Sequence, residues 1–528
     1  MTRAPLSPHS PSPRTRSGVH PSARAAAEPL AAPQAAEWTP DQVRGDGGIA
    51  ATVPSLNRRS LLTAGALAGV GMATPAIAAP ACPSKRPAPA DRRFTSPAVE
   101  RDLTRVAKQI GDPKLRWMFG NCYPNTLDTT VRMSSVDGKP DAFVITGDIP
   151  CLWLRDSSAQ LKPYLHLVKT APELRRLFTG LIARQARCIL IDSYANAFME
   201  DPTAKSNLEW SLHDDTVMKP GVAERKWEVD SLCYPMRLAH QYWRATGDKT
   251  PFDATWAAAA KRSIATFREQ QRMDGHGPYS FRRSAPQPTE TLLWGYGNPT
   301  RPNGLIHSGF RPSDDSCTYP MLIPSNLFAM TALRELATVA QETGNDGGIV
   351  RDATQLALEI ESALRRFGTM RLRDGREVWA YEVDGFGNAL FMDDANVPSL
   401  SGLAYLGCVD PADPLWQRTR DACWSDTNPW FFKGTAGEGI GGPHVGEGQI
   451  WPMSLTIRAL TSTDDATIRA CLKTLRDTDG GTGFIHESFD RNDPAKFTRS
   501  WFAWANGLFA ELILHLAKTK PALLKETF

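Results

Sequence analysis

The sequence predicts an all-α protein in which paired helices close into a barrel and long loops along one rim build a site. Three observations predict this fold class. Ten segments after about residue 95 carry apolar residues at three- and four-residue spacing, which is typical of helices. Runs that alternate as strands do are few and short. Long loops rich in Gly, Pro, Asp and aromatic residues precede several of the helices, and loops of such length in a compact domain are usually functional.

The predicted helices follow one another along the body of the chain. They cover residues 99–110, 157–170, 172–192, 228–246, 252–273, 325–344, 348–367, 449–462, 465–477 and 500–518. Stop signals support two boundaries: Thr246-Gly247-Asp248 ends one helix, and residues 343–348 (TGNDGG) separate two others. Two strand-like pieces, Ala142–Thr146 and Glu377–Tyr381, are interpreted as loop hairpins. The long connections are expected at residues 119–156, 274–324, 382–399, 426–450 and 478–500.

The N-terminal region is predicted to contain an export signal. Residues 1–56 are rich in Pro, Ser, Ala and Arg, lack apolar periodicity and are expected to be disordered. Residues 57–79 contain the pair Arg58-Arg59 before a mild apolar run that ends in Ala76-Ile77-Ala78, and this resembles a twin-arginine export signal with its cleavage site. The run is too short for a membrane span. Residues 80–94 are interpreted as a linker and 95–528 as one catalytic domain, which is expected to be periplasmic or extracellular.

Charge and composition narrow the class of ligand. Residues 1–78 hold seven Arg and four acidic residues, so the rest of the chain has no net charge and no Lys/Arg run. A nucleic-acid partner needs a concentrated positive surface and is therefore not expected. The 15 Trp residues fit a sugar ligand, because an indole offers a flat apolar face and one N–H donor, although a Trp-rich core would explain many of them.

Cysteine and histidine spacing gives no metal or cofactor signature. The nine Cys include no CxxC pair, and the odd count leaves at least one thiol unpaired. The ten His include no HExxH motif, and His486-Glu487 lacks a second ligand at helical spacing. We therefore expect neither a metal site nor a bound cofactor.

Acids in aromatic or Gly-rich loops are the candidates for chemistry. Glycoside hydrolysis usually needs two carboxyl groups, one to protonate the leaving oxygen and one to act as nucleophile or to activate water. Asp314 and Asp315 lie beside Arg311 in residues 307–316 (HSGFRPSDDS), where adjacent carboxyls can split their pKa values. Glu487 lies between aromatics just before the last predicted helix. Helix capping by the Asp pair and a solvated loop glutamate are the structural alternatives.

Three further segments could bind a ligand. Arg155 and Asp156 precede a helix and could clamp adjacent sugar hydroxyls, or could form a structural ion pair. Glu228 and Asp230 are two residues apart, which suits a turn that enters a helix; Asp230 could also simply cap it. His444 lies in residues 434–451 (GTAGEGIGGPHVGEGQIW), whose glycines let the backbone approach a ligand closely.

Taken together and in this order, the segments resemble glycoside hydrolase family 125, the metal-independent exo-α-1,6-mannosidases. The resemblance rests on Phe119–Thr130 (FGNCYPNTLDTT), Gly147–Ser157 (GDIPCLWLRDS), Trp227–Pro235 (WEVDSLCYP), Gly309–Ser316 (GFRPSDDS), Asp384–Pro398 (DGFGNALFMDDANVP), Gly441–Trp451 (GGPHVGEGQIW) and Phe484–Asp490 (FIHESFD). Several short motifs in one order are far more specific than any single one. They span nearly the whole body of the chain.

The resemblance implies an (α/α)6 barrel and inversion at the anomeric carbon of a non-reducing terminal α-1,6-linked mannose, as in N-glycan cores. It implies an Asp general acid within the Asp314-Asp315 pair, for which we favour Asp314, and Glu487 as general base. The resemblance also implies the residues that line the pocket of the cleaved mannose, which are Arg155, Asp156, Glu228, Asp230, Arg311 and His444. The alternatives are another inverting barrel hydrolase that acts on α-glucosides, and a non-catalytic glycan-binding barrel. A polysaccharide lyase would suit a more basic groove.

Overall fold

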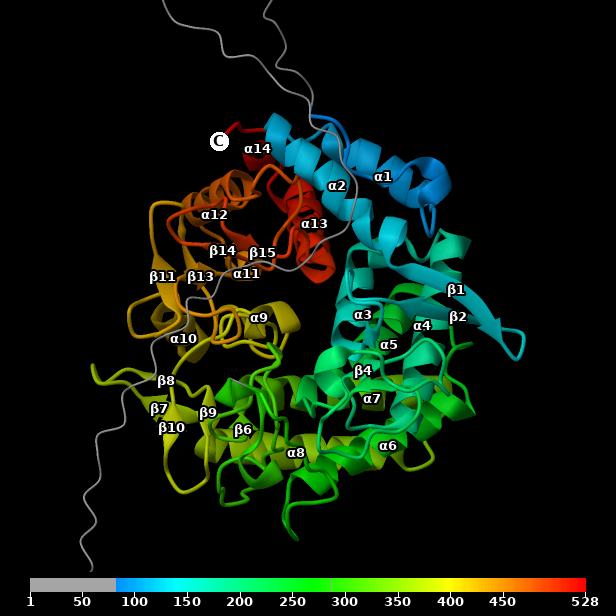
Figure 1. The fold of residues 1–528 in the computed structure, drawn as a ribbon, viewed down its shortest axis with the longest axis vertical. Coiled ribbons are helices and arrows are strands. Elements are labelled where there is room, and N and C mark those ends of the chain that lie inside the picture. Colours follow the sequence, from blue (N-terminus) through cyan, green and yellow to red (C-terminus); the bar gives the residue numbers. More distant parts are fainter. Residues whose placement is uncertain (1–81, 286) are drawn as a thin grey trace, which may run out of the picture. The chain divides into compact units, whose positions relative to one another are not determined.

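The computed structural model describes residues 82–285 and 287–528, and helices form most of the regular structure in these residues (Figure 1). The helices are α1 (Pro97–Ala107), α2 (Pro113–Thr129), α3 (Leu154–Leu161), α4 (Pro172–Ile191), α5 (Val229–Thr246), α6 (Ala254–Gln270), α7 (Ile323–Thr343), α8 (Ile349–Phe367), α9 (Leu403–Leu406), α10 (Pro414–Cys423), α11 (Pro452–Leu460), α12 (Asp465–Asp477), α13 (Ala503–Thr519) and α14 (Pro521–Leu524). The predicted extension at 1–56 and the export signal at 57–79 lie outside the described residues.

The longer helices alternate between two sets along the chain. In the first set, α13 packs on α3 and on α11, α3 packs on α5, α5 on α7, and α7 on α9. In the second set, α2 lies against α13, α4 against α5 and α6, α6 against α8, α8 against α7, and α12 against α11. The start and the end of the body therefore lie side by side, with blue α2 next to red α13 (Figure 1). One hydrophobic core runs through these helices from Val99 to Leu524.

All ten predicted helices are present, and the stop signals act as expected. α5 ends at Thr246, where Gly247 adopts the left-handed conformation with φ of 69°. α7 ends at Thr343 before Gly344, and α8 begins at Ile349. Several helices begin at an acidic cap; Asp253, for example, accepts hydrogen bonds from the backbone N–H groups of the first turn of α6.

The prediction of a loop over residues 119–156 is wrong in its first third, because α2 extends to Thr129. This helix lacks amphipathic periodicity because almost every side chain from Asn121 to Asp128 is buried. It also contains Pro124, which cannot donate a backbone hydrogen bond and is usually a helix breaker. The helices α9 and α10 were also missed, since α9 has only four residues and α10 lies between loops rich in Asp and Pro.

The strands of the described residues are two to six residues long and form six small sheets. The predicted hairpins are present as β1 (Val131–Val136) with β2 (Lys139–Val144), and β7 (Thr369–Arg371) with β8 (Glu377–Trp379). A further pair is β11 (Phe431–Lys433) with β12 (Glu438–Ile440). Three sheets stand just before helices of the first set: β3 (Leu152–Trp153), β4 (Ala197–Phe198) and β5 (Val222–Glu224); β6 (Met321–Leu322), β9 (Glu382–Val383) and β10 (Ala389–Leu390); and β13 (Gln449–Ile450), β14 (Ser488–Asp490) and β15 (Phe497–Thr498). These sheets fix the loops that enter α3, α5, α7, α11 and α13.

The segment from residue 82 to 94, which the sequence analysis assigned to a linker, is bound to the first helices. Arg86 forms ion pairs with Asp128 of α2 at 2.7 Å and with Glu100 of α1 at 2.5 Å. The indole N–H of Trp117 donates to the carbonyl oxygen of Pro83 at 2.8 Å. The nearly buried Arg86–Asp128 pair and the Trp117 hydrogen bond hold this segment, so it is part of the folded body.

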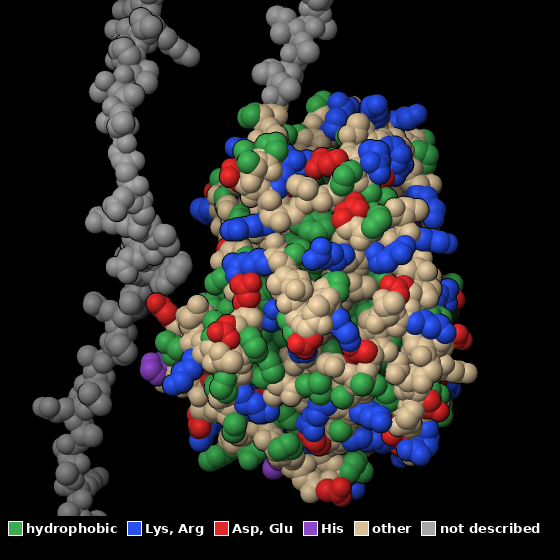
Figure 2. All heavy atoms as spheres, turned by 90° about the vertical axis from the view of Figure 1, so that its right-hand side faces the viewer, with side chains coloured by type: hydrophobic (Ala, Val, Ile, Leu, Met, Phe, Trp, Pro, Cys, Tyr) green, Lys and Arg blue, Asp and Glu red, His purple; other side chains and the backbone are tan. Residues whose placement is uncertain are grey.

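Basic and acidic side chains are interspersed on the face formed by α1, β1 and α4 (Figure 2). Exposed basic residues there include Arg101 and Arg105 of α1 and Arg175 and Arg176 of α4. The nine cysteines all lie within the described residues, where none forms a disulfide and most are buried. No helix in the described ranges is long and apolar enough to cross a membrane.

Candidate active site

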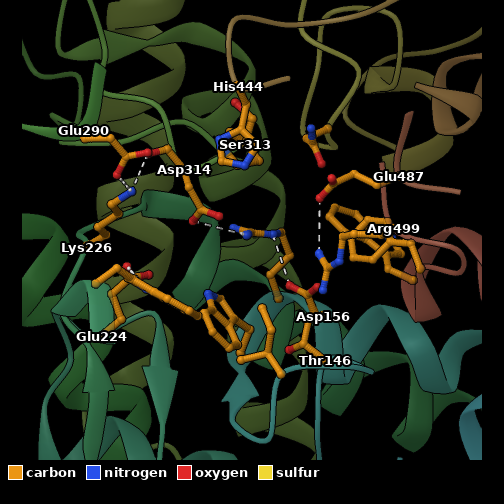
Figure 3. Close-up of a pocket in the computed structure, with 18 of the residues that line it drawn as sticks. Thr146, Asp156, Glu224, Lys226, Glu290, Ser313, Asp314, His444, Glu487 and Arg499 are labelled. Atoms are coloured by element: carbon orange, nitrogen blue, oxygen red, sulfur yellow. Dashed lines mark hydrogen bonds and ion pairs between the residues drawn. The ribbon is translucent and has the colours of Figure 1, made fainter. Parts of the chain in front are cut away.

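One cavity of about 390 Å³ collects the loops that precede the helices of the first set. Its lining residues come from the segments before or at the start of α3, α5, α7, α11 and α13, and from the loop before α9 (Figure 3). They are Thr146, Ile149, Trp153, Arg155, Asp156, Trp210, Glu224, Lys226, Arg283, Ala285, Gln287, Glu290, Pro312, Ser313, Asp314, Asn396, His444, Trp451, Glu487, Arg499, Phe502 and Trp504. Acids, cations and several aromatic faces thus surround a space of the size that small ligands occupy.

The adjacent acids Asp314 and Asp315 point to different environments. The Asp314 side chain lines the cavity and is 29 % exposed, whereas the Asp315 side chain is 1 % exposed and is not among the lining residues. Burial raises the pKa of Asp315 to about 6. His444 Nδ1 lies 4.0 Å from Asp315 Oδ1. Of the two acids, only Asp314 is placed to contact a ligand directly.

A tight, strained turn aims Asp314 into the cavity. Its φ of 72° lies in the left-handed region, which costs a non-glycine residue of order 1–3 kcal/mol in unfavourable backbone energy. The turn is held by hydrogen bonds from Asp314 N–H to the Arg311 carbonyl and from Arg311 N–H to the Asp315 carbonyl. The buried ammonium of Lys226 also donates to the Asp314 carbonyl oxygen at 2.9 Å. Strain maintained by several contacts at one position is typical of functional sites.

Glu487 faces the same cavity from the opposite side (Figure 3). It directly precedes β14, and its side chain is 12 % exposed. Arg499 donates to Glu487 Oε1 at 3.2 Å and also pairs with Asp148 of the loop before β3. A carboxylate that is fixed by one guanidinium and keeps a free oxygen toward the cavity can accept a proton from a water molecule.

Arg155 lies at the floor of the cavity among four carboxyl groups. Its guanidinium nitrogens lie 2.5 Å from Glu228, 3.2 Å from Asp230, 3.4 Å from Asp156 and 4.0 Å from Asp314. Its side chain is only 4 % exposed, and its guanidinium carbon lies 5.7 Å from the centre of the Trp504 ring. One cation cannot neutralise four carboxylates at this depth, so the cluster must retain protons.

The pKa directions in this cluster follow from that imbalance. Burial, and after it the Asp314 carboxylate, raises the pKa of Glu228 well above its usual range despite Arg155. Burial likewise raises the pKa of Asp230 to about 6. Burial favours the protonated form of Asp314 as well, but Lys226, Arg155 and His444 outweigh it and hold the pKa of Asp314 below its ordinary value. The sequence analysis expected the adjacent Asp315 to shift the pKa of Asp314. In the structure, the carboxyl group that affects the pKa of Asp314 is Glu228.

The structure divides the predicted binding residues into two groups. Arg155, Asp156 and His444 line the cavity. Glu228 and Asp230 are fully buried beneath Arg155 and are not lining residues. Arg311 is also buried, where it binds Glu382 at 2.7 Å and stacks over Tyr381. The family resemblance implied that these three line the sugar pocket, whereas in the structure they lie behind the residues that reach the cavity.

Two glycines of the Gly-rich loop lie close to neighbouring protein atoms. A Cβ at Gly441 would lie 2.2 Å from the Gln449 carbonyl oxygen, and one at Gly442 would lie 3.2 Å from the Asp394 carboxylate. Asp394 in turn accepts a hydrogen bond from Ser313 at 2.5 Å, beside Asp314. Gly442 and Asp394 therefore pack the loop that carries His444 against the turn that carries Asp314.

Sequence reasoning missed one wall of the cavity. This wall consists of Trp210, Glu224, Lys226, Arg283 and Glu290 on the Asp314 side. The Trp210 indole N–H donates to Glu224 at 3.1 Å, and Arg283 bridges Glu224 and Glu290 at 2.9 Å each. Lys226 directly precedes the motif Trp227–Pro235, and the other four residues lie outside the quoted motifs. Trp210 and Arg283 stand alone in loops, and only the tertiary structure brings them together.

The described residues include no group of three His, Cys, Asp or Glu side chains arranged to hold a metal ion. At the carboxyl cluster around Arg155, the guanidinium pairs with Glu228 at 2.5 Å and with Asp230 at 3.2 Å.

Comparison with known proteins gives one consistent result. The model of the metal-independent α-mannosidases of glycoside hydrolase family 125 matches residues 112–514. The chain is 42 % identical over 464 residues to the meiotically up-regulated gene 157 protein of Schizosaccharomyces pombe, which covers 84 % of this chain and 90 % of that protein. A solved Streptococcus pneumoniae structure, from a family described as metal-independent α-mannosidases and holding a non-productive complex with α-1,6-mannobiose, has a TM-score of 0.77 and 39 % identity. It covers 81 % of this chain and all of its own.

Proposed function

Because the chain belongs to glycoside hydrolase family 125, the metal-independent α-mannosidases, we propose that it removes terminal α-1,6-linked mannose from the non-reducing end of glycans. It is a glycoside hydrolase of the α-mannosidase kind. The observation that carries the proposal is the cavity into which Asp314 and Glu487 point from opposite sides (Figure 3). The glycan substrate is of the class found in processed N-glycan cores. The mannobiose complex of the Streptococcus pneumoniae protein supports the α-1,6 linkage.

The proposed reaction inverts the anomeric carbon and uses no metal. Asp314 protonates the glycosidic oxygen, which leaves with the rest of the glycan. Glu487 removes a proton from a water molecule as that water attacks the anomeric carbon from the opposite face. This mechanism requires the two carboxyl groups to be roughly 6.5–9.5 Å apart, so that the water fits between the sugar and the base. Arg155, Asp156 and His444 would contact hydroxyl groups of the cleaved mannose.

We further propose that the helices form an (α/α)6 barrel. The alternating packing supports this, with α3, α5, α7, α9, α11 and α13 as the inner helices and α2, α4, α6, α8, α10 and α12 as the outer helices. In that arrangement the N-terminal ends of the inner helices share one rim, where the cavity lies. A crystal structure in which α9 and α11 are not neighbours would contradict it.

The deciding experiment incubates the full chain with α-1,6-mannobiose and follows the released mannose by proton NMR. We expect β-mannose as the first product, at a rate that EDTA does not change and that Glu487→Ala abolishes. Initial α-mannose would contradict inversion. Turnover of an α-glucoside but not of the mannobiose would favour the other inverting barrel hydrolase. Sugar binding with no turnover of any glycoside would make the chain a glycan-binding protein.

Export by the twin-arginine route is a separate proposal, which rests on Arg58-Arg59 and Ala76-Ile77-Ala78. The test compares the full chain with the Arg58→Lys/Arg59→Lys double variant in a bacterium that has this route. We expect the unchanged chain outside the cytoplasm and the double variant retained inside. Equal export of both would contradict the assignment.

A further inference from the structure

The fully buried Glu228 has a position that a sugar-binding role does not explain. It is 0 % exposed and lies beneath the cavity, behind Asp314. Its Oε2 binds Arg155 at 2.5 Å and accepts a hydrogen bond from the Ser231 hydroxyl at 2.9 Å. Its Oε1 is buried and has no hydrogen-bond donor. A buried carboxylate oxygen without a donor is costly, so this oxygen needs a partner.

The group that faces it is Asp314. Both carboxyl groups adjoin the guanidinium of Arg155, whose nitrogens lie 2.5 Å from Glu228 Oε2 and 4.0 Å from Asp314 Oδ1, and a hydrogen bond joins the two carboxyl groups when one of them is protonated. Asp314 Oδ1 is likewise buried without a donor. Two ionised carboxylates only accept hydrogen bonds and repel each other at this range. A single proton between them satisfies both oxygens at once. The same proton reduces the excess of negative charge around Arg155.

We infer that Glu228 is a positioning residue for the acid: it shares one proton with Asp314, so that Asp314 is the cavity-facing end of a two-carboxyl acid. The inference rests on the proposed hydrolysis for its function, but the proton itself belongs to the free protein. The shared proton moves to Asp314 when a glycosidic oxygen accepts it. The C–O bond then breaks with its electron pair on the leaving oxygen, and water supplies both the attacking hydroxyl and, through Glu487 and solvent, the proton that reloads the pair.

The other charged groups around Asp314 make this partner necessary. Lys226 and Arg155 approach it from two sides and His444 lies across the cavity, and all three favour the ionised form. Asp156 and Asp230 also surround Arg155, but neither makes the contact with Asp314 that Glu228 makes. Lys226, Arg155 and the hydrogen bond from Glu228 all lower the pKa of Asp314, so the proton of the pair rests on Glu228, and without Glu228 the pair would hold no proton for Asp314 to deliver.

The test replaces Glu228 by Gln, which keeps the shape but carries no shareable proton. Its amide donates to Asp314 and thereby stabilises the carboxylate. For α-1,6-mannobiose we expect the alkaline limb of kcat/KM to move to lower pH by about one unit or more, a loss of about tenfold at a fixed pH on that limb. A 2,4-dinitrophenyl α-mannoside needs no protonation of its leaving group, so its rate should change by less than about threefold.

Two variants control for structural damage. Asp230→Asn removes another carboxylate from Arg155 and is expected to leave the alkaline limb where it is. Glu228→Asp retains a carboxyl group, so we expect its alkaline limb of kcat/KM to lie between those of wild type and Glu228→Gln. An unmoved limb in Glu228→Gln would overturn the inference, and so would equal losses on both substrates, because equal losses indicate a binding or folding role.

A second measurement does not depend on the proposed function. A protonated carboxyl group has a C=O infrared band that a carboxylate lacks. At neutral pH we expect the wild-type spectrum to show this band and the difference spectrum with Glu228→Gln to show its loss. A chain that lacks mannosidase activity would contradict the proposed function while still showing the band. An unchanged band in Glu228→Gln would contradict the shared proton whatever the substrate.

Discussion

Replacing Asp314 and Asp315 separately by Asn should affect turnover to very different extents. Adjacent in sequence, the two acids are separated by the fold, because Asp314 lines the cavity and Asp315 does not. Each replacement removes one ionisable oxygen and changes the volume little. The comparison therefore isolates what each carboxyl group does for the reaction.

The expected magnitudes follow from the contacts of each residue. General acid catalysis contributes about 10²- to 10⁴-fold, so Asp314→Asn should lower kcat/KM for α-1,6-mannobiose by that factor, or about 3–5 kcal/mol of activation free energy. The Asp315 side chain reaches the cavity only through His444, at 4.0 Å and with the His444 side chain 30 % exposed. An ion contact of this kind is worth about 1 kcal/mol or less, which limits the loss in Asp315→Asn to about fivefold.

The assay uses two leaving groups and one stability measurement. On a 2,4-dinitrophenyl α-mannoside, Asp314→Asn should keep most of its activity because this leaving group departs without a proton. Thermal unfolding shows whether Asp315→Asn is folded. Burial raises the folded-state pKa of Asp315 to about 6. Its pKa in the unfolded chain is about 4, so the ionisation of Asp315 lowers the stability of the folded protein as pH rises from about 4 to 6. Asp315→Asn should therefore melt higher than wild type at pH 7 and equally at pH 4. A loss of 10²-fold or more in Asp315→Asn, with Asp314→Asn near wild type, would refute the assignment.

Three further predictions concern the base, the N-terminal segment and acid stability. Glu487→Ala should lower mannobiose turnover by about 10²- to 10⁴-fold, and added azide should restore turnover as β-mannosyl azide; restoration as the α-azide would contradict a base on the far face of the sugar. Arg86→Met should lower the free energy of unfolding by about 1–3 kcal/mol in denaturant titrations, because it removes both hydrogen bonds of Arg86 to the Asp128 carboxylate, 3 % exposed, and leaves only Arg92 at 3.6 Å. Its kcat should not change, the exposed Arg101→Met serves as control, and equal stability of both variants would contradict the role of the segment. Hydrogen bonds from His166 and Arg105 overcome burial and lower the pKa of Asp102 to about 2. Asp102 thus stabilises the fold above about pH 4 and loses this effect as pH falls to about 2, so Asp102→Asn should be less stable than wild type at pH 6 and equal to it near pH 2, and a pH-independent difference would contradict this.

Helix positions were predictable from the sequence wherever one helix face is buried and the other is exposed. α8, with apolar residues at positions such as Ala353, Leu356, Ala357 and Ile360, shows this pattern and was located within one residue at its start. α2 shows the limit of the method. This helix is buried on nearly all sides, so its sequence has no alternation of polar and apolar faces at helical spacing. Its Asn, Thr and Asp residues therefore led to the prediction of a loop.

Site residues were predictable from the sequence where a motif contains side chains that the proposed chemistry needs. Asp314 and Glu487 were proposed as carboxyl groups in aromatic loops before helices, and both line the cavity. Glu228 and Asp230 lie in an equally specific motif, but a motif does not say whether a charged side chain faces the ligand or the residue behind it. Trp210 and Arg283 had no motif at all, since loops more than 70 residues apart meet only in the folded chain.

The electrostatics of Asp314 and Glu487, the proposed acid and base, explain why buried supporting residues such as Glu228 belong to the motifs. Glu487 has one cation beside it, Arg499, and that arrangement suits a group that must begin the reaction ionised. Asp314 has the two cations Lys226 and Arg155 beside it, and by itself would also be ionised. The site would then hold two bases and no acid. Glu228 removes this symmetry, because a second carboxyl in contact with the first makes one proton more favourable than none. On this argument, the difference between acid and base arises one layer below the cavity wall, and a substitution at Glu228 that never touches the sugar should change the pH dependence of its cleavage.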